Sequence, residues 1–196
     1  RSLGPVWSRS NAFGHGVPFC FPSGPDTGPG LTAEGKYLVR ACNELGILVD
    51  VSHLNEQGFW DVARISEAPL VASHSNAHSL CPSSRNLTDE QLQAIAQSHG
   101  LVGVNFCTSD LRPDGLDEAD TSIELIYQQF DYLVERIGVE HVAFGSDFDG
   151  CIIPAELGDV LGLTELVSGL EARGYSQTDL EQMALGNWLR VLADSW

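Results

Sequence analysis

The sequence predicts an α/β fold in which parallel strands alternate with helices, and three observations support this prediction. Short apolar or β-branched runs, long enough for buried strands and too short for helices, recur along the chain. Amphipathic segments of helix length separate these runs, which favours a parallel arrangement of the strands. Three of the runs end in residues suited to chemistry, namely His53, His74 and Asp147. Because functional groups in parallel α/β folds gather at the carboxyl ends of strands, we expect a site there.

The predicted elements follow one another without a linker, so residues 1–196 are expected to form one domain. Residues 1–30 are rich in Gly, Pro, Ser and aromatic side chains and predict a long loop with a short strand at 3–7. Predicted helices span residues 33–45, 56–65, 89–98, 121–137, 163–173 and 177–192, and predicted strands span residues 47–51, 70–73, 101–105 and 142–146. Thr32 and Asn55 are suited to cap the first two helices, and Gly46 to end the first.

About four or five βα units are too few to close an eight-stranded barrel, for which about 250 residues is typical. An open doubly wound sheet would bind its ligand at a glycine-rich phosphate loop, and the sequence contains none. We therefore predict the carboxyl-terminal portion of a TIM-like (β/α)8 barrel, with the amino-terminal strands missing from this single partial domain.

The composition excludes several classes of protein. With 27 acidic and 10 basic residues, the net charge of −17 leaves no basic face for nucleic acid. No run is apolar enough to span a membrane, and we expect no signal peptide. The five cysteines are odd in number and lack metal-type spacing, which favours reduced thiols and a cytoplasmic location.

A histidine that follows a strand is more often a structural hydrogen-bonding group than a metal ligand. His53 and His74, however, end two successive strands, and neighbouring strands lie about 4.8 Å apart. Both rings could then reach one ion, and imidazole suits zinc.

Other histidines fit structural roles better. His78 falls in a polar loop, and His99 and His141 precede strands at the opposite edge of the sheet. His15 lies between two glycines in the long loop, where it could reach a substrate.

Charged groups complete the candidate site. A carboxylate at Asp147, at the mouth of a strand, can hold a water and shuttle its proton. Asp149 precedes a glycine, which is more typical of loop capping. Arg85 lies in the loop after the second histidine strand, where its guanidinium could bind a substrate carboxylate or pair with an acidic side chain.

Several motifs resemble the membrane (renal) dipeptidase family, the M19 metallopeptidases. They are Gly30-Leu31-Thr32, the stretch from Glu44 to His53, the stretch from Pro69 to Ala77, Ser84-Arg85-Asn86-Leu87, Val104-Asn105-Phe106, the stretch from Phe144 to Gly150, and the stretch from Gly186 to Val191. The resemblance implies a TIM-like barrel with a binuclear zinc site that hydrolyses dipeptides. It implies that His53 and His74 bind the second zinc, that Arg85 binds the terminal carboxylate of the substrate, and that Asp147 is the catalytic acid/base.

The chain also departs from the family pattern. It contains no His-x-Asp for the first zinc and is expected to begin after the glutamate that bridges the two metals. A substrate-binding Thr-His-x-x-Asn pattern of the family corresponds here to Trp7 through Asn11. Asn11 therefore matches while the histidine does not, and His15 or Arg9 could replace it.

We expect a zinc-dependent dipeptidase, and two alternatives remain open. One is a non-catalytic metal-binding barrel, favoured by the missing histidine, and the other is an amidohydrolase that acts on cyclic amides. The resemblance also makes a homodimer plausible. With only one histidine pair, residues 1–196 alone are expected to bind metal weakly and to have little activity.

Overall fold

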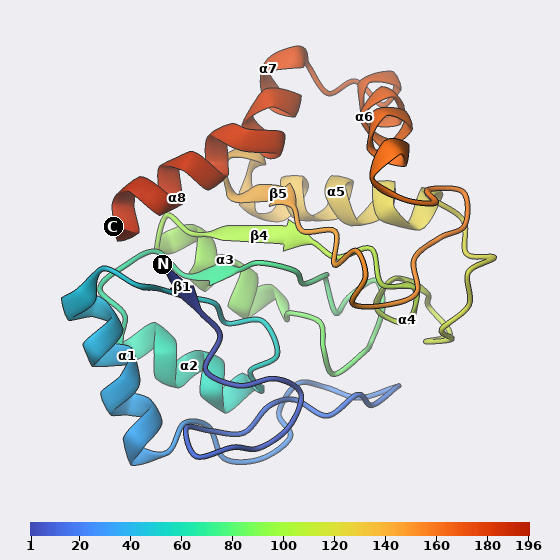
Figure 1. Ribbon diagram of the computed structural model, residues 1–196. Coiled ribbons are helices and arrows are strands. Elements are labelled where there is room, and N and C mark those ends of the chain that lie inside the picture. Colours follow the sequence, from blue (N-terminus) through green and yellow to red (C-terminus); the bar gives the residue numbers. More distant parts are fainter.

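The computed structural model describes residues 1–196, and five short parallel strands run through its centre (Figure 1). They are β1 (Ser2–Leu3), β2 (Leu48–Val49), β3 (Val71–Ala72), β4 (Leu101–Val104) and β5 (Val142–Phe144). β1 pairs with β2, and β3, β4 and β5 pair in that order. A parallel bridge between Asp50 and Val71 joins the two sheets. The strands therefore follow sequence order, as expected for successive βα units, and they do not close into a barrel.

Helices connect the strands. They are α1 (Ala33–Leu45), α2 (Glu56–Ile65), α3 (Asp89–Gln97), α4 (Thr108–Leu111), α5 (Glu124–Ile137), α6 (Leu163–Ala172), α7 (Gln177–Glu181) and α8 (Asn187–Ser195). The predicted caps are confirmed, because Thr32 accepts the amide of Gly35 and Asn55 accepts that of Gly58. Gly46 ends α1 at a φ of 59°, a left-handed conformation that favours glycine.

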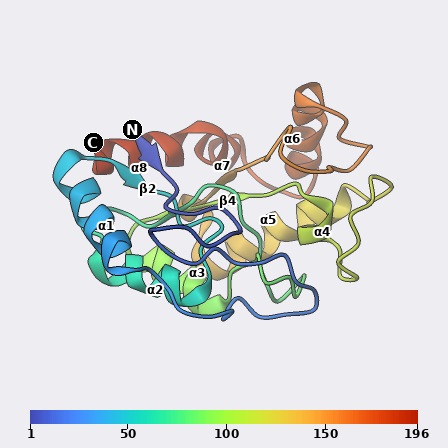
Figure 2. The same ribbon diagram turned by 60° about the horizontal axis from the view of Figure 1, so that its bottom comes forward.

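Two apolar layers enclose the strands. The larger cluster contains buried side chains of α1, α2, α3 and α5 together with residues from β2 to β5. On the other side, a smaller cluster packs Val191 of α8 against Leu48, Val71, Leu101 and Ala143. The views in Figures 1 and 2 agree that α8 lies on the side of the strands opposite α2 and α3. β2 to β5 are thus covered on both faces, as is usual for a parallel sheet, whereas β1 is more exposed.

Several predicted boundaries were wrong, and the strands predicted at 47–51 and 142–146 end at Val49 and Phe144. The strand predicted at 3–7 ends at Leu3, because Pro5 offers no amide hydrogen to a ladder. The helix predicted from residue 121 begins at Glu124, because the hydroxyl of Thr121 instead bonds the Glu118 carbonyl in a turn. A π-helical segment, Gln182–Gly186, separates α7 from α8 within the helix predicted at 177–192. The short helix α4 was not predicted.

The two chain ends lie side by side (Figure 1). The Trp196 indole donates to the carbonyl oxygen of Arg1 at 3.2 Å, and the Arg1 guanidinium lies 5.8 Å from the Trp196 ring. No helix combines the length and the apolar character that crossing a bilayer requires.

Candidate metal centre and active site

His53 and His74 meet at the carboxyl ends of β2 and β3. Their Nε2 atoms lie 2.9 Å apart, with ring centroids separated by 4.9 Å. The backbone of His53 has a φ of 68°, a left-handed conformation that ends the extended run after Val51. The predicted convergence of the two imidazoles on one point is therefore observed.

The outer nitrogen of each ring also has a partner. The Nδ1 atom of His53 lies 2.9 Å from the Ser8 hydroxyl, and that of His74 lies 2.7 Å from the Ser73 hydroxyl. Asp50 accepts the Ser73 hydroxyl at 2.5 Å and the Ser73 amide at 3.0 Å. Such outer contacts fix the orientation of metal-binding histidines.

Two glycines allow the backbone at Ser73 to lie close to the next strands. A Cβ atom on Gly103 would lie 2.1 Å from the Ser73 carbonyl oxygen, and one on Gly145 would lie 2.2 Å from it. Any larger residue at either position would displace the backbone that carries His74. The glycines therefore help to set the position of the backbone that carries His74.

The surroundings keep both rings neutral. Burial, the Arg85 guanidinium and His74 together lower the pKa of His53 to about 2. Burial and Arg85 also lower the pKa of His74, against the opposing effect of Asp50 and Asp147. Neutral imidazole is the form that binds metal ions.

The donors present fit a zinc site in part. Two neutral imidazole nitrogens facing each other suit zinc, whereas catalytic zinc usually takes three protein ligands. Within residues 1–196, no three His, Cys, Asp or Glu side chains are grouped so that they could hold one ion. The structure thus supports a histidine pair and leaves the remaining ligands unassigned.

Arg85 lies beside the pair and is 4% exposed. Its guanidinium donates to the Ser75 hydroxyl at 2.9 Å and to the His74 carbonyl at 2.7 Å. None of the ion pairs in the structure involves Arg85, so the alternative of a pair with an acidic side chain is not observed. Burial lowers the pKa of Arg85, an effect that Asp110, Asp50 and Asp147 oppose. A buried cation without a direct counter-ion is costly, and an anionic ligand would offset that cost.

Asp147 follows β5 on the same edge of the sheet. Its φ is 58°, and its carbonyl accepts the amide of Gly150 in a tight turn. Its carboxylate accepts a 3.4 Å hydrogen bond from Asn105, the residue after β4. Asp149 is exposed in the same turn, consistent with its predicted loop role.

Asn11 and His15, the two loop residues that the sequence predicts to bind substrate, form hydrogen bonds within their own loop. The side chain of Asn11 donates to the Pro5 carbonyl and accepts the amides of Phe13 and Gly14, so it stabilises its own loop. His15 bonds the Ser10 hydroxyl at 3.0 Å. A role for either in binding substrate remains a prediction.

Two of the remaining histidines have structural partners, and His99 is exposed. His78 bonds the carbonyl of Ser23 at 3.0 Å, and His141 is buried against the carbonyl of Gly100 at 2.9 Å. Neither contacts the histidine pair, as the sequence predicted.

Sequence reasoning missed Ser8, Ser73, Asp50 and Asn105. Three of these residues had a signal in the sequence. Ser73 directly precedes His74 at the end of a strand, Asn105 directly follows a strand, and Asp50 lies three positions before His53. Ser8 gave no such signal, because 45 residues separate it from its partner His53.

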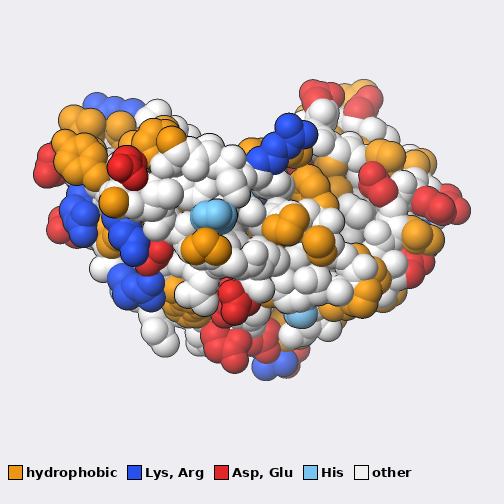
Figure 3. All heavy atoms as spheres, turned by 90° about the horizontal axis from the view of Figure 1, so that it is seen from below, with side chains coloured by type: hydrophobic (Ala, Val, Ile, Leu, Met, Phe, Trp, Pro, Cys, Tyr) orange, Lys and Arg blue, Asp and Glu red, His pale blue; other side chains and the backbone are white.

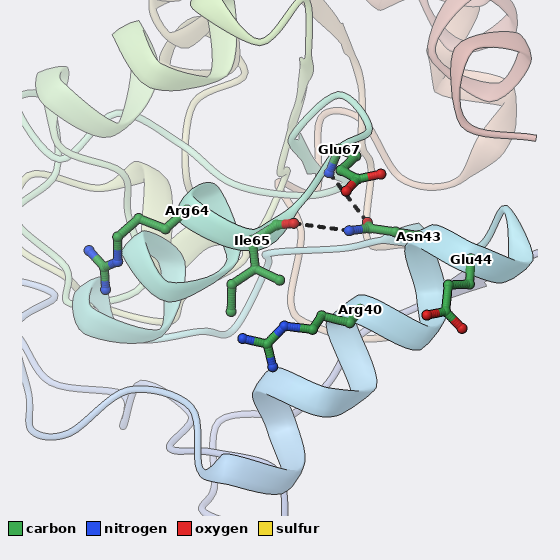
Figure 4. A pocket seen from close by; sticks show the side chains of 6 residues that line it. All are labelled: Arg40, Asn43, Glu44, Arg64, Ile65 and Glu67. Carbon is green, nitrogen blue, oxygen red and sulfur yellow. Dashed lines mark hydrogen bonds between the residues drawn. The ribbon is translucent and has the colours of Figure 1, made fainter.

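Figure 3 shows one face of the molecule, where basic and acidic side chains are mixed at one end and acidic side chains predominate at the other. A separate surface pocket of about 390 Å³ lies between the carboxyl ends of α1 and α2 (Figure 4). Asn43 fixes its wall by donating to the carbonyl of Ile65 at 2.9 Å. This pocket is at the opposite edge of the sheet from the histidines.

Comparison with known proteins agrees with this geometry. A family model described as membrane dipeptidase, peptidase family M19, matches residues 1–195. The chain therefore belongs to the M19 family, and its strands and helices match the carboxyl-terminal part of the TIM-like barrel of that family.

Individual relatives are similar over much of the chain. An uncharacterized protein in the pqqA 5′ region of Klebsiella pneumoniae is 54% identical over 196 residues, covering 100% of this chain and 72% of that protein. The dipeptidase aclJ of Aspergillus oryzae is 36% identical over 166 residues, covering 84% of this chain and 39% of that protein. A metallo peptidase from Rhodobacter sphaeroides, crystallised with a phosphinate mimic of the dipeptide L-Ala-D-Ala, is 54% identical with a TM-score of 0.98. The match covers 100% of this chain and 56% of that structure.

Proposed function

We propose that this chain forms the part of a zinc-dependent dipeptidase that binds one metal and the carboxyl end of the substrate. The observation that carries the proposal is the buried Arg85 guanidinium, without a counter-ion, next to two neutral histidines that face one another. Membership of the M19 family and the dipeptide mimic held by the Rhodobacter relative support it.

Each residue of the site has a separate role in this proposal. His53 and His74 would hold zinc through Nε2, and Arg85 would bind the terminal carboxylate of a dipeptide. Zinc, when bound, supplies Lewis acidity that lowers the pKa of water toward about 7 and polarises a carbonyl. Asp147 would accept a proton from the attacking water and pass it to the leaving amine, and Asn105 would orient the Asp147 carboxylate.

Zinc as the metal, a cytoplasmic location and a homodimer belong to the same proposal. Zinc is supported by the two imidazole donors, because imidazole is a preferred ligand of that ion. The odd number of cysteines without metal-type spacing favours the location, and the dimer rests on family resemblance alone.

The test is a panel of dipeptides assayed with the protein in its natural context, with and without added zinc. Hydrolysis that requires zinc and a free terminal carboxylate is the expected result. Zinc binding without turnover of any dipeptide would favour the non-catalytic barrel, for which the serine at position 8 in place of the family histidine is the motivating observation. Turnover of cyclic amides alone would favour the amidohydrolase alternative.

A further inference from the structure

Two large aromatic side chains lie exposed at the edge of the sheet that carries the candidate site. Trp7 is 51% exposed and Phe19 is 59% exposed, and their rings form an edge-to-face contact with centroids 5.5 Å apart. The Trp7 ring also lies 5.7 Å from the ring of His53. Exposed apolar surface gathered in one place often marks a groove that binds a ligand.

The backbone holds the Trp7 ring in place. The amide of Arg9 donates to the Trp7 carbonyl at 2.6 Å, which closes a tight turn. A Cβ atom on Gly16 would lie 1.7 Å from the same carbonyl oxygen, so a larger residue there would displace the turn. The Arg9 guanidinium lies over the Trp7 ring, 5.4 Å from its centre. The indole is therefore oriented before any ligand arrives.

Phe19 lies in a segment that is bonded to two parts of the site. Two residues before it, the amide of Val17 donates to the His53 carbonyl at 2.8 Å. The residue after it donates its amide to the hydroxyl of Ser84 at 3.0 Å. Ser84 belongs to the loop that follows β3 and carries the guanidinium group of the site. The segment thus extends from the end of β2 to that loop.

Strand order places Trp7 at one end of the site. Trp7 follows β1, His53 follows β2 and His74 follows β3, and these strands are neighbours in that order. Arg85 donates to the His74 carbonyl, at the β3 end. β1 and β3 are two strand spacings, or about 10 Å, apart, and an extended dipeptide spans about 7 Å without its side chains. A dipeptide whose carboxylate is bound at Arg85 can therefore reach Trp7 with its amino-terminal side chain.

We propose that Trp7 and Phe19 form the wall of a subsite for the amino-terminal side chain of the substrate, and that they favour dipeptides in which this side chain is apolar or aromatic. The inference rests on the proposed dipeptidase function and adds a substrate class to it. Contact with the two rings removes an apolar side chain from water, and an aromatic one also packs on the indole.

Two series of dipeptides, assayed with the protein in its natural context, test the assignment. One series compares Phe-Ala with Gly-Ala, and the other compares Ala-Phe with Ala-Gly. Trp7→Ala should lower the ratio of kcat/KM for Phe-Ala over Gly-Ala about 10-fold and change the Ala-Phe over Ala-Gly ratio by less than about twofold. An unchanged ratio in the first series, or an equal or larger change in the second, would overturn the assignment.

Two further variants show whether the effect belongs to the ring at this position. Trp7→Phe keeps an aromatic ring and should retain most of the preference for Phe-Ala. Tyr37→Ala is the matched control, because Tyr37 is an aromatic side chain of α1 that is 72% exposed. It should leave both ratios unchanged, and an equal loss of preference in this control would refute the role of Trp7.

Calorimetric binding of the same dipeptides separates this proposal from the proposed function. If no dipeptide is hydrolysed, but Phe-Ala binds more tightly than Gly-Ala and Trp7→Ala removes the difference, the dipeptidase function fails and the subsite is supported. Equal binding of the two dipeptides, or binding of neither, would overturn the subsite. Hydrolysis of both with equal kcat/KM would also overturn the subsite while supporting the dipeptidase function.

Discussion

At the scale of single residues, Arg85 is distinguished by burial without a counter-ion. A guanidinium binds a carboxylate through two parallel hydrogen bonds, a geometry that an ammonium group cannot reproduce. Its donors already hold Ser75 and the His74 carbonyl, so the residue is fixed in place before any ligand arrives. This fixed orientation favours a role in binding over a role in proton transfer.

Arg85→Lys should therefore raise KM for dipeptides about 10- to 100-fold, the equivalent of a lost charge-assisted hydrogen bond. Amidated analogues, which lack the carboxylate, should change by less than about threefold in the same assay. Metal content measured on the variant provides the control, since Arg85 also contacts His74. Equal losses on both kinds of substrate would show that Arg85 does not bind the carboxylate.

Asp147 is expected to transfer a proton from the attacking water, whereas Arg85 is expected to bind the substrate. Asp147→Asn keeps the shape and the contact with Asn105 but removes the base, so kcat should fall by at least about 100-fold with little change in KM. Metal content should stay nearly constant in elemental analysis. Loss of metal in this variant would identify Asp147 as a ligand instead.

The lowered pKa of His53 predicts how stability depends on pH. Above pH 6.5 the ring is neutral in both folded and unfolded chains, so it contributes no pH dependence. Below that value His53 binds a proton in the unfolded chain but stays neutral in the folded chain down to about pH 2. The free energy of unfolding should therefore decrease as pH falls.

The slope should stay below about 1.4 kcal/mol per pH unit, because the ring is only partly buried and solvent screens it. Urea titrations from pH 7 to pH 4 should show that His53→Asn has a shallower slope than the unchanged metal-free chain. His99→Asn removes an exposed histidine of similar positive φ, 57° against 68°, and should keep the original slope. A slope unaffected by His53→Asn would contradict the prediction.

At the scale of elements, Asn55 links the start of α2 to the long loop. Its side-chain oxygen caps the helix, and its amide donates to the carbonyls of Gly28 and Pro29, both at 3.0 Å. One side chain thus stabilises a helix terminus and holds the loop that carries Ser8 against β2 and α2.

Asn55→Ala should lower the free energy of unfolding by about 2 kcal/mol, since it removes a cap and two part-buried hydrogen bonds to the carbonyls of Gly28 and Pro29. Thr88→Ala, which removes only the capping box of α3, should cost about 1 kcal/mol. Denaturant unfolding of both variants gives the comparison. A smaller loss for Asn55→Ala than for Thr88→Ala would show that the loop contacts contribute nothing.

Local sequence signals predicted the elements well and their ends less well. Caps such as Thr32 and Asn55 act within one turn, so the starts of α1 and α2 could be read from neighbouring residues. The start of α5 depended on a turn formed by Thr121, and the break between α7 and α8 has no Pro to mark it. Such features depend on competition between local and tertiary hydrogen bonds.

At the scale of the whole molecule, strand order explains how much of the site was predictable. His53, His74 and Asp147 follow successive or nearby strands, so parallel order alone brings them to one edge. Ser8 reaches His53 because the long loop folds back over that edge, with the amide of Val17 bonded to the carbonyl of His53. No short-range pattern encodes a contact of this kind.

The open sheet leaves β1 and β5 with one neighbour each. Unpaired parallel edges favour pairing with further strands, from another segment or another chain. The same incompleteness holds at the metal site, where the described residues supply two imidazoles and no third grouped ligand. Residues 1–196 therefore leave the edges of β1 and β5 unpaired and supply two of the three protein ligands that a catalytic zinc ion usually has.

Residues 1–196 expressed alone should consequently bind zinc weakly, at no more than one ion per chain, and hydrolyse dipeptides little or not at all. Two nitrogen ligands leave a zinc ion short of the three protein ligands usual in catalytic sites, so affinity should be low and exchange fast. Competition with a colorimetric chelator, followed by elemental analysis after gel filtration, measures this. The double variant His53→Asn with His74→Asn should lose the residual binding, which assigns it to the pair. A monodisperse chain with two tightly held ions and robust dipeptide turnover would show that these residues already form a complete active site.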